Sequence, residues 1–456
     1  MIEFVDVHTH LEMPEFDEDL EEVIKRALEH QITFICTVGT EPKYWEKAKL
    51  IAESHKNIYF SLGLHPHEAT CYNKDIEKMV MGYLSHEKCL MLGEIGLDYF
   101  KNYSPKDIQI KVFERQLNIA EELNKPVMIH IRDAHREAKE ILKKRELIGI
   151  IHCYSGTLED AKFYIDLGYY ISFPGTLTFK KATNIAEVVK NIPLDYILTE
   201  TDAPFLAPEP YRGKRNEPAF VTQVTKKIAE IKQLPLEDVA RTIKINTEKV
   251  FGLRAEKKAR LVYKIRNALY INLTNRCSNQ CVFCGKNRDF FVKGHFLKLD
   301  KEPTLEEILQ ELPENLQSYD EIVFCGYGEP TLRLEVIKEL SIVFKKRATR
   351  KIRLNTDGLA SLRESRNIPY ELKDYIDSVS ISLNASDEAT YNKLCRPNIP
   401  NAFQGLINFI NESKKYIKEV VVSAVAVPGI DIKKVRDFAE NQLNVRFRER
   451  PYNDLG

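Results

Sequence analysis

The sequence predicts an α/β protein made of a complete (β/α)8 barrel followed by a partial (β/α)6 barrel. Strand-like runs alternate with helical stretches along both parts of the chain. The length of 456 residues also exceeds one ordinary domain. In addition, ten of the eleven histidines precede residue 253, whereas five of the nine cysteines follow it. This asymmetry indicates two different inorganic chemistries on one chain.

The change of side-chain inventory also sets the expected domain boundaries. An average domain takes roughly 150 residues, and an α/β barrel alone can take about 250. We therefore expect a first domain over residues 1–252, a basic linker over 253–266 and a second domain over 267–456. The linker is expected to be a solvated connector.

Composition and charge exclude several classes of protein. The 67 basic and 67 acidic residues cancel, which excludes a globally basic nucleic-acid-binding surface but not a local basic groove. No run approaches the ~18 apolar residues of a membrane span, and the N-terminus lacks the regions of a signal peptide. We therefore expect a cytoplasmic protein without a membrane partner. In that compartment, clustered cysteines indicate metal or redox ligands.

Eight short runs rich in β-branched residues predict the strands of the first barrel. They lie at 2–8, 32–37, 58–64, 91–95, 126–131, 148–153, 169–173 and 195–199. Charged stretches with helical spacing lie between most of them, for example at 15–30, 105–124, 133–144 and 157–167. Eight strands in alternation with helices are typical of a closed barrel.

Polar side chains recur at the ends of these predicted strands. They include Asp6, His8, His10, His65, His67, Glu94, Asp98, His130, Arg132, His152, Glu200 and Asp202. The catalytic groups of such barrels lie at the C-terminal ends of the strands, where the βα loops converge. We therefore expect these residues to meet in one mouth.

This set of imidazoles and carboxylates suits zinc and other divalent transition ions. His8 and His10 are two residues apart on a strand, so both can face one ion. His130 and His152 would hold a second ion, and the two oxygens of Glu94 could bridge the pair. Asp202 could complete the first site or act as the base on a metal-bound water. Two ions about 3.5–4 Å apart generate hydroxide and stabilise charge on a phosphoryl oxygen.

Several motifs around these residues resemble those of the TatD family. They lie at 6–10 (DVHTH), 63–67 (GLHPH), 93–99 (GEIGLDY), 152–156 (HCYSG), 199–204 (TETDAP) and 212–218 (RGKRNEP). The resemblance covers essentially all of residues 1–252 and implies a metal-dependent TIM-barrel deoxyribonuclease, in some members a 3′→5′ exonuclease. It implies two divalent ions, zinc, magnesium or manganese, held by His8, His10, Glu94, His130, His152 and Asp202. Ends of DNA or RNA are the implied substrate.

A weaker signature concerns the substrate phosphate. Arg132 lies two residues beyond His130, while Arg212 and Arg215 lie in a loop after the eighth predicted strand. That loop is either a solvated turn or a site that binds backbone phosphates. His65 is expected to contact the scissile phosphate, which makes it the third catalytic candidate beside Asp202 and Glu94.

A compact cysteine motif follows the first predicted strand of the second domain. Its members are Cys277, Cys281 and Cys284, with the spacing C-x3-C-x2-C. Three thiolates from one loop leave a fourth coordination position open, where a four-iron cluster can bind a small chelating molecule. The alternative is a closed structural zinc site with a fourth protein ligand. Its candidates are Cys325, His295 and Cys395.

Six runs predict the strands of the partial barrel. They lie at 268–273, 321–325, 351–354, 378–383, 419–427 and 445–448. Helical stretches such as 304–312, 334–345 and 403–415 separate them. Polar groups again end the strands, including the turn Gly328-Glu329-Pro330 and Asn384.

The second domain resembles the radical SAM superfamily in its cysteine spacing, in Phe283 and in its Gly-Glu-Pro turn. The resemblance implies a [4Fe–4S] cluster whose open iron chelates S-adenosyl-L-methionine (SAM), and a reductant such as flavodoxin or ferredoxin. It also implies that Gly328 and Glu329 hold the methionine amino group. Phe283 would lie near the adenine, and Asn384 or Ser382 would reach the ribose or carboxylate. Tyr327 departs from the pattern, because many members have adjacent glycines there.

The whole chain therefore resembles a TatD-type hydrolase fused to the short radical SAM protein associated with that family. The leading hypothesis is a bifunctional enzyme that hydrolyses phosphodiesters and generates an adenosyl radical for an unknown substrate. One alternative keeps the metal hydrolase but gives it an amide or ester bond to cut. Another has a non-catalytic iron–sulfur half that senses redox state or SAM and regulates the nuclease.

Overall fold

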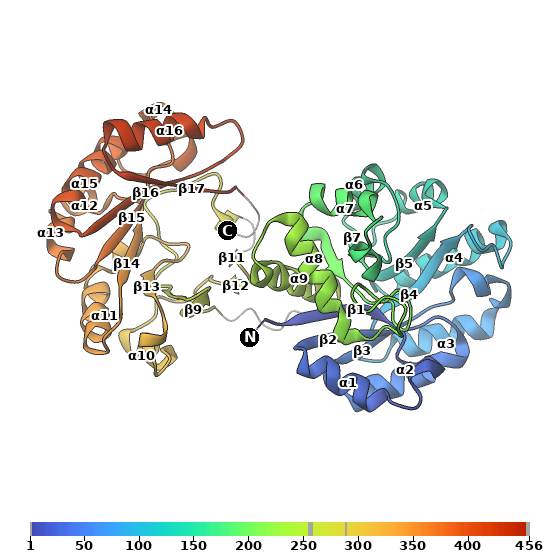
Figure 1. The fold of residues 1–456 in the computed structure, drawn as a ribbon. Helices are drawn as coiled ribbons and strands as arrows, with labels where there is room; N and C mark the ends of the chain where they lie inside the picture. The colour runs from blue at the N-terminus through green and yellow to red at the C-terminus, as the bar shows by residue number, and fades with distance from the viewer. Residues whose placement is uncertain (1, 254–258, 288–289, 453–456) are drawn as a thin grey trace. The chain divides into compact units, whose positions relative to one another are not determined.

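A computed structural model describes residues 2–253, 259–287 and 290–452. The chain forms two compact units, residues 1–255 and 256–456, shown as ribbons in Figure 1. Part of the expected linker, 254–258, lies outside the described residues. Among the described residues, no helix has both the length and the apolar character needed to cross a membrane.

Eight parallel strands, in sequential order, make the sheet of the first unit. They are β1 (Phe4–Thr9), β2 (Ile32–Gly39), β3 (Ile58–Leu62), β4 (Cys89–Asp98), β5 (Val127–Arg132), β6 (Gly149–Ile151), β7 (Tyr170–Phe173) and β8 (Ile197–Thr199). The hydroxyl of Thr199 donates to the carbonyl of Val5 at 3.1 Å, which links β8 to β1. The predicted (β/α)8 barrel is confirmed, and β4 extends beyond its expected range at both ends.

Helices surround this sheet (Figure 1). They are α1 (Leu20–Glu29), α2 (Pro42–Ser54), α3 (Lys74–Leu84), α4 (Lys106–Glu122), α5 (His135–Leu142), α6 (Leu158–Asp166), α7 (Thr183–Asn191), α8 (Val221–Lys232) and α9 (Leu236–Val250). Short 3-10 helices lie at η1 (Pro14–Phe16), η2 (Pro66–Cys71), η3 (Gly175–Thr178), η4 (Leu194–Tyr196) and η5 (Pro218–Phe220). Local sequence sets some boundaries: Thr157 and Asp160 form a capping box that starts α6.

A glycine in β4 lets two site-bearing strands approach closely. Gly96 has a φ of +143°, and a Cβ atom there would lie 2.0 Å from the carbonyl oxygen of His130. Only glycine fits such an approach and backbone conformation. The contact holds the end of β4, with Glu94 and Asp98, against the end of β5.

The second unit contains a seven-stranded sheet in the order β17-β16-β15-β14-β13-β10-β9. Its strands are β9 (Val262–Ile265), β10 (Ala268–Ile271), β13 (Glu321–Phe324), β14 (Ile352–Thr356), β15 (Ser378–Ser382), β16 (Glu419–Val425) and β17 (Arg446–Arg450). The six predicted strands run parallel, and β9 pairs antiparallel with β10. Strand β9 was not predicted. It lies inside the segment expected to be a linker. The basic composition of that segment gave no sign that four of its residues pair with β10.

Helices cover one face of this sheet (Figure 1). They are α10 (Leu305–Glu311), α11 (Leu334–Lys346), α12 (Ala360–Glu364), α13 (Ile368–Leu372), α14 (Glu388–Cys395), α15 (Ala402–Tyr416) and α16 (Ile432–Asp437). The remaining elements are β11 (Phe291–Val292), β12 (His295–Phe296), η6 (Gly285–Asn287), η7 (Leu316–Ser318), η8 (Pro330–Arg333) and η9 (Phe438–Gln442). The hydrophobic core lies between the helices and the sheet, around side chains such as Ile381, Val422 and Phe447.

Candidate active sites

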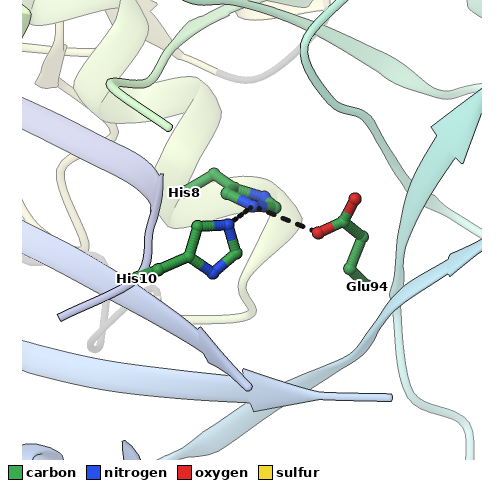
Figure 2. A group of neighbouring side chains, drawn as sticks. All are labelled: His8, His10 and Glu94. Atoms are coloured by element: carbon green, nitrogen blue, oxygen red, sulfur yellow. Dashed lines mark hydrogen bonds and ion pairs between the residues drawn. The ribbon is translucent and has the colours of Figure 1, made fainter. Parts of the chain in front are cut away.

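The first site begins with two histidines at the C-terminal end of β1. His8 and His10 both point toward Glu94 of β4 (Figure 2). Their Nε2 atoms are 3.3 Å apart, and His8 Nε2 lies 3.5 Å from Glu94 Oε2. All three side chains are buried, and their ligand atoms are close enough together to hold one metal ion.

Asp202, which follows β8, completes this group. Its Oδ1 lies 3.3 Å from His10 Nε2 and 3.7 Å from His8 Nε2. The backbone N–H of Asp202 donates to the carbonyl of His8 at 3.0 Å, which fixes the end of β8 beside β1. Residues from the two ends of the barrel sequence thus meet, as the strand-end pattern predicted.

The other oxygen of Glu94 faces a second group of imidazoles. Oε1 lies 2.8 Å from both His130 Nδ1 and His152 Nε2. His65 Nε2 is 3.2 Å from the same oxygen, so His65 belongs to this cluster. Glu94 therefore stands between two sets of nitrogen ligands, which is the position that a bridging carboxylate requires.

Polar partners fix the rings of these histidines from behind. His10 Nδ1 lies 2.8 Å from the carbonyl oxygen of Val38. Asp98 Oδ2 lies 3.1 Å from His130 Nε2 and 3.0 Å from His67 Nε2. Such partners set the tautomer and orientation of metal-ligating histidines. The sequence placed Asp98 at a strand end but gave no signal of this contact.

The electrostatics of the cluster favour bound cations. Burial alone would raise the pKa of Glu94, but the charges of His152 and His65 hold it well below its ordinary value. Burial likewise opposes ionisation of Asp202, and the hydrogen bond to His10 nevertheless lowers its pKa. Buried ionised carboxylates need a compensating charge. This donor set fits two divalent ions of the kind that bind nitrogen and oxygen.

The arginines expected to bind phosphate lie in different environments. Arg132 and Arg212 are exposed, and their guanidinium carbons lie 3.9 Å from the Phe100 ring centre and 4.4 Å from the Phe179 ring centre, respectively. Arg215 instead forms an ion pair with Asp19 at 2.6 Å. Arg212 Nη1 also lies 3.9 Å from Glu209 Oε1. Among the described residues, Arg132 is therefore the one of these three arginines without an ion pair.

Exposed aromatic side chains accompany the cluster, and the sequence analysis did not predict them. Phe100, Tyr103 and Phe205 are 57%, 66% and 47% exposed. The ring centre of Tyr103 lies 4.8 Å from that of His67, and the ring centre of Phe205 lies 6.2 Å from that of His10. The metal-ligand cluster is thus flanked by apolar rings that face solvent.

The second site lies on the loop after β10. Cys277, Cys281 and Cys284 are partly exposed and free of disulfides. Burial raises the pKa of Cys277 and of Cys284, so iron binding would displace protons from thiols. Of the three alternative fourth ligands, the structure brings Cys395 against this loop. Its backbone carbonyl accepts from Gln280 N at 2.9 Å, and its thiol raises the pKa of the neighbouring Cys281 thiol.

The Gly-Glu-Pro turn after β13 positions the cysteine loop. A Cβ atom on Gly328 would lie 2.1 Å from the carbonyl oxygen of Thr274, and Glu329 N donates to the Arg276 carbonyl at 2.7 Å. The Glu329 carboxylate accepts hydrogen bonds from the hydroxyls of Thr331 and Thr356 and from Asp357 N, at 2.6, 2.7 and 2.6 Å. These partners already occupy the carboxylate expected to bind the SAM amino group.

A neighbouring carboxyl, that of Asp357, has one oxygen without a hydrogen-bond partner. Burial and the adjacent Glu329 raise the pKa of Asp357 well above its ordinary value. Its Oδ2 atom is buried without a hydrogen-bond partner, as is Oδ1 of Asn384. Phe283 is half-buried against the core. Unpartnered acceptors near the cysteines fit a cofactor that carries an amino group and ribose hydroxyls.

Comparisons with known proteins match both units. Residues 5–252 match the family described as TatD related DNase, and residues 271–441 match the Radical SAM superfamily. The Bacillus subtilis protein named uncharacterized metal-dependent hydrolase YabD is 41% identical over 251 residues, which are 54% of this chain and 98% of that protein.

Two further relatives carry a more specific name or a solved structure. The Pantoea ananatis protein named 3′-5′ ssDNA/RNA exonuclease TatD is 32% identical and aligns with 54% of this chain and 99% of its own length. The crystal structure of the Escherichia coli TatD homologue YjjV is 28% identical with a TM-score of 0.53. It covers 55% of this chain and 98% of its own.

Proposed function

Because the chain belongs to the TatD-related DNase family and carries a radical SAM domain, we propose that it is a bifunctional enzyme. The first unit hydrolyses phosphodiester bonds at exposed ends of DNA or RNA. The second unit cleaves SAM reductively at a [4Fe–4S] cluster. A relative named as a single-strand DNA and RNA exonuclease supports the first activity.

In the first unit, the chain's own residues hold the reacting groups. Divalent ions, when bound, would activate a water molecule and neutralise charge on the phosphoryl group. His8, His10, His130 and His152 would hold these ions around Glu94. Asp202, partly open to the mouth, either accepts the proton of the attacking water or serves as a ligand. His65 lies close enough to contact the scissile phosphate.

The exposed aromatic rings are the observation that favours a nucleic-acid substrate over a small ester or amide. Unpaired bases stack on exposed aromatic side chains, and each stacking contact contributes ~1–3 kcal/mol. Phe100 and Tyr103 offer such faces, and the guanidinium of Arg132 over Phe100 can meet the adjacent phosphate. A small ester would use none of these surfaces.

The test of this activity is hydrolysis of end-labelled single-stranded oligonucleotides with zinc, magnesium or manganese. The double variant Phe100→Ala/Tyr103→Ala is expected to raise KM at least tenfold, because each base loses its stacking partner. Tyr370→Ala, which removes an exposed aromatic ring of the second unit, is the matched control. Faster cleavage of p-nitrophenyl acetate than of any oligonucleotide would favour the ester alternative.

The second unit provides thiolates and acceptors for its cofactors. Cys277, Cys281 and Cys284 would bind three irons, which leaves the fourth iron to chelate the amino and carboxylate groups of SAM. Asp357 Oδ2 and Asn384 Oδ1 would supply acceptors for the N–H groups of its coordinated amine and for its ribose hydroxyl groups.

Anaerobic reconstitution with iron and sulfide, followed by dithionite and SAM, tests this assignment through release of 5′-deoxyadenosine. The contact between Cys395 and Cys281 makes Cys395→Ala the informative variant. If the three cysteines hold an iron–sulfur cluster, this variant should keep the iron–sulfur absorbance and should still release 5′-deoxyadenosine. A four-thiolate zinc site would lose its metal instead, and the wild-type protein would release no 5′-deoxyadenosine.

A further inference from the structure

The face of the second sheet that turns away from the helices carries many polar residues beside a few valines. Successive strand residues point to opposite faces, and Ile381, Val422 and Phe447 point into the core between sheet and helices. Their neighbours Ser380, Ser423 and Arg448 therefore lie on the other face, which we call the inner face. Parallel sheets that are packed on both faces carry apolar residues on both. An inner face with many polar residues indicates a surface for a polar ligand.

Two arginines of β17 bring positive charge to this inner face. Arg448 and Arg450 are two residues apart, and the strand register places them beside Ser423 and Val425 of β16. Arg448 Nη2 lies 3.4 Å from Ser380 Oγ. Within the described part of the chain, no carboxylate forms an ion pair with either arginine.

Arg450 is the less satisfied of the two. Its Nε atom is buried without a hydrogen-bond partner. Burial lowers the pKa of Arg450, and the charge of Arg448 acts in the same direction. Two further inner-face arginines, Arg353 and Arg446, differ because they are paired with Glu321 at 2.7 Å and with Glu419 at 3.7 Å, respectively. A buried cationic donor without a partner costs free energy unless a ligand supplies the anion.

These arginines lie at the end of the sheet where the cysteine loop lies. Arg450 is close enough to Cys281 and Cys395 for their charges to interact. Arg448 is exposed, so a ligand can reach it from solvent. An anion bound by the pair would hold the rest of its molecule near the place where the adenosyl radical forms.

We propose that Arg448 and Arg450 bind a phosphate group of the molecule on which the radical unit acts, so that its substrate is a phosphate ester such as a nucleotide. This inference rests on the proposed radical function. Two guanidinium groups match the charge and the several acceptor oxygens of a phosphate monoester. Serine hydroxyls on the same face can serve the remaining oxygens. The first unit would release molecules of this class.

The test compares a phosphorylated probe with its neutral counterpart. Calorimetry measures binding of deoxyadenosine monophosphate and of deoxyadenosine to the full chain. The protein is reconstituted with its cluster, loaded with SAM and kept without divalent ions in the barrel site. Arg448→Gln and Arg450→Gln are each expected to weaken the nucleotide at least tenfold and to leave deoxyadenosine unchanged. Arg446→Gln, an exposed arginine of the same strand that pairs with Glu419 at 3.7 Å, should change nucleotide binding less than twofold.

Unchanged nucleotide binding in both variants would overturn the phosphate site. An equal loss of SAM affinity would also overturn it, because the arginines would then hold the SAM carboxylate. Release of 5′-deoxyadenosine is measured on the same samples. If the wild-type protein releases no 5′-deoxyadenosine, the radical function itself is contradicted. If it releases 5′-deoxyadenosine but the arginine variants bind the nucleotide as wild type does, only this inference is contradicted.

Discussion

The two candidate sites are built in opposite ways. The ligands of the first lie at the ends of five strands between residues 8 and 202, and most of them are buried by the barrel. The cysteines of the second lie on one loop between residues 277 and 284 and are partly exposed. The first site is thus a property of the whole fold, whereas the second is a property of a loop that the fold positions.

The sites also differ in the sign of their charge. The barrel mouth holds ionised Glu94 and Asp202, whose pKa values the positive charge of the neighbouring histidines lowers, and metal cations can supply that positive charge in their place. The inner face of the second sheet instead carries Arg448 and Arg450, which have no carboxylate partner among the residues that the structure describes. One site therefore attracts cations, and the other attracts an anionic substrate. Changes at one site should leave the chemistry of the other intact.

Cys281→Ala is expected to have the largest effect. Two thiolates from the loop cannot hold the cluster, so iron–sulfur absorbance and 5′-deoxyadenosine release should fall to background. Hydrolysis of oligonucleotides should stay within twofold of wild type. A nuclease that needs Cys281 would contradict the separation of the sites and favour a regulatory iron–sulfur domain.

Asp98→Asn should produce the next largest effect, and only in the barrel. Loss of the carboxylate behind His130 weakens metal binding and hydrolysis about 10–100-fold, measured by calorimetry with manganese and by initial rates. Asp107→Asn, an exposed change on α4 that also removes a carboxylate, is the matched control. Equal metal affinity in wild type and Asp98→Asn would remove Asp98 from the site.

Arg212→Gln should have the smallest effect. Loss of one phosphate contact should raise KM for single-stranded DNA about threefold and leave kcat unchanged. The slope of log K for DNA binding against log salt concentration should become shallower by about 0.7. Lys111→Gln removes an equal charge from an exposed position on α4 and should change neither value. If both variants behave alike, Arg212 contributes only to the overall charge.

Strand periodicity predicted the framework of both units, because alternation of strands and helices is a local pattern. Strand β4 shows the limit of this pattern: the sequence predicted 91–95, but pairing with β3 and with β5 extends the strand over Cys89–Asp98. Strand β9 was missed because its pairing with β10, not its composition, makes it a strand.

The candidate ligands were predictable, since they fall at the ends of recognisable strands. Their supporting contacts were not, because these join residues remote in sequence. The ion pair of Arg215 with Asp19 and the hydrogen bonds that occupy Glu329 arise only when separate loops meet. The exposed rings of Phe100 and Tyr103 also required the fold, since exposure cannot be read from residue type.

The central claim, two independent catalytic centres on one chain, is tested most directly with Asp202→Asn. Hydrolysis and 5′-deoxyadenosine release are measured side by side on one anaerobically reconstituted preparation. We predict that hydrolysis falls by about 10²–10⁴-fold, because the barrel loses a metal ligand or base. Release of 5′-deoxyadenosine should equal that of wild type. Loss of both activities in a folded protein with a full cluster would contradict the claim.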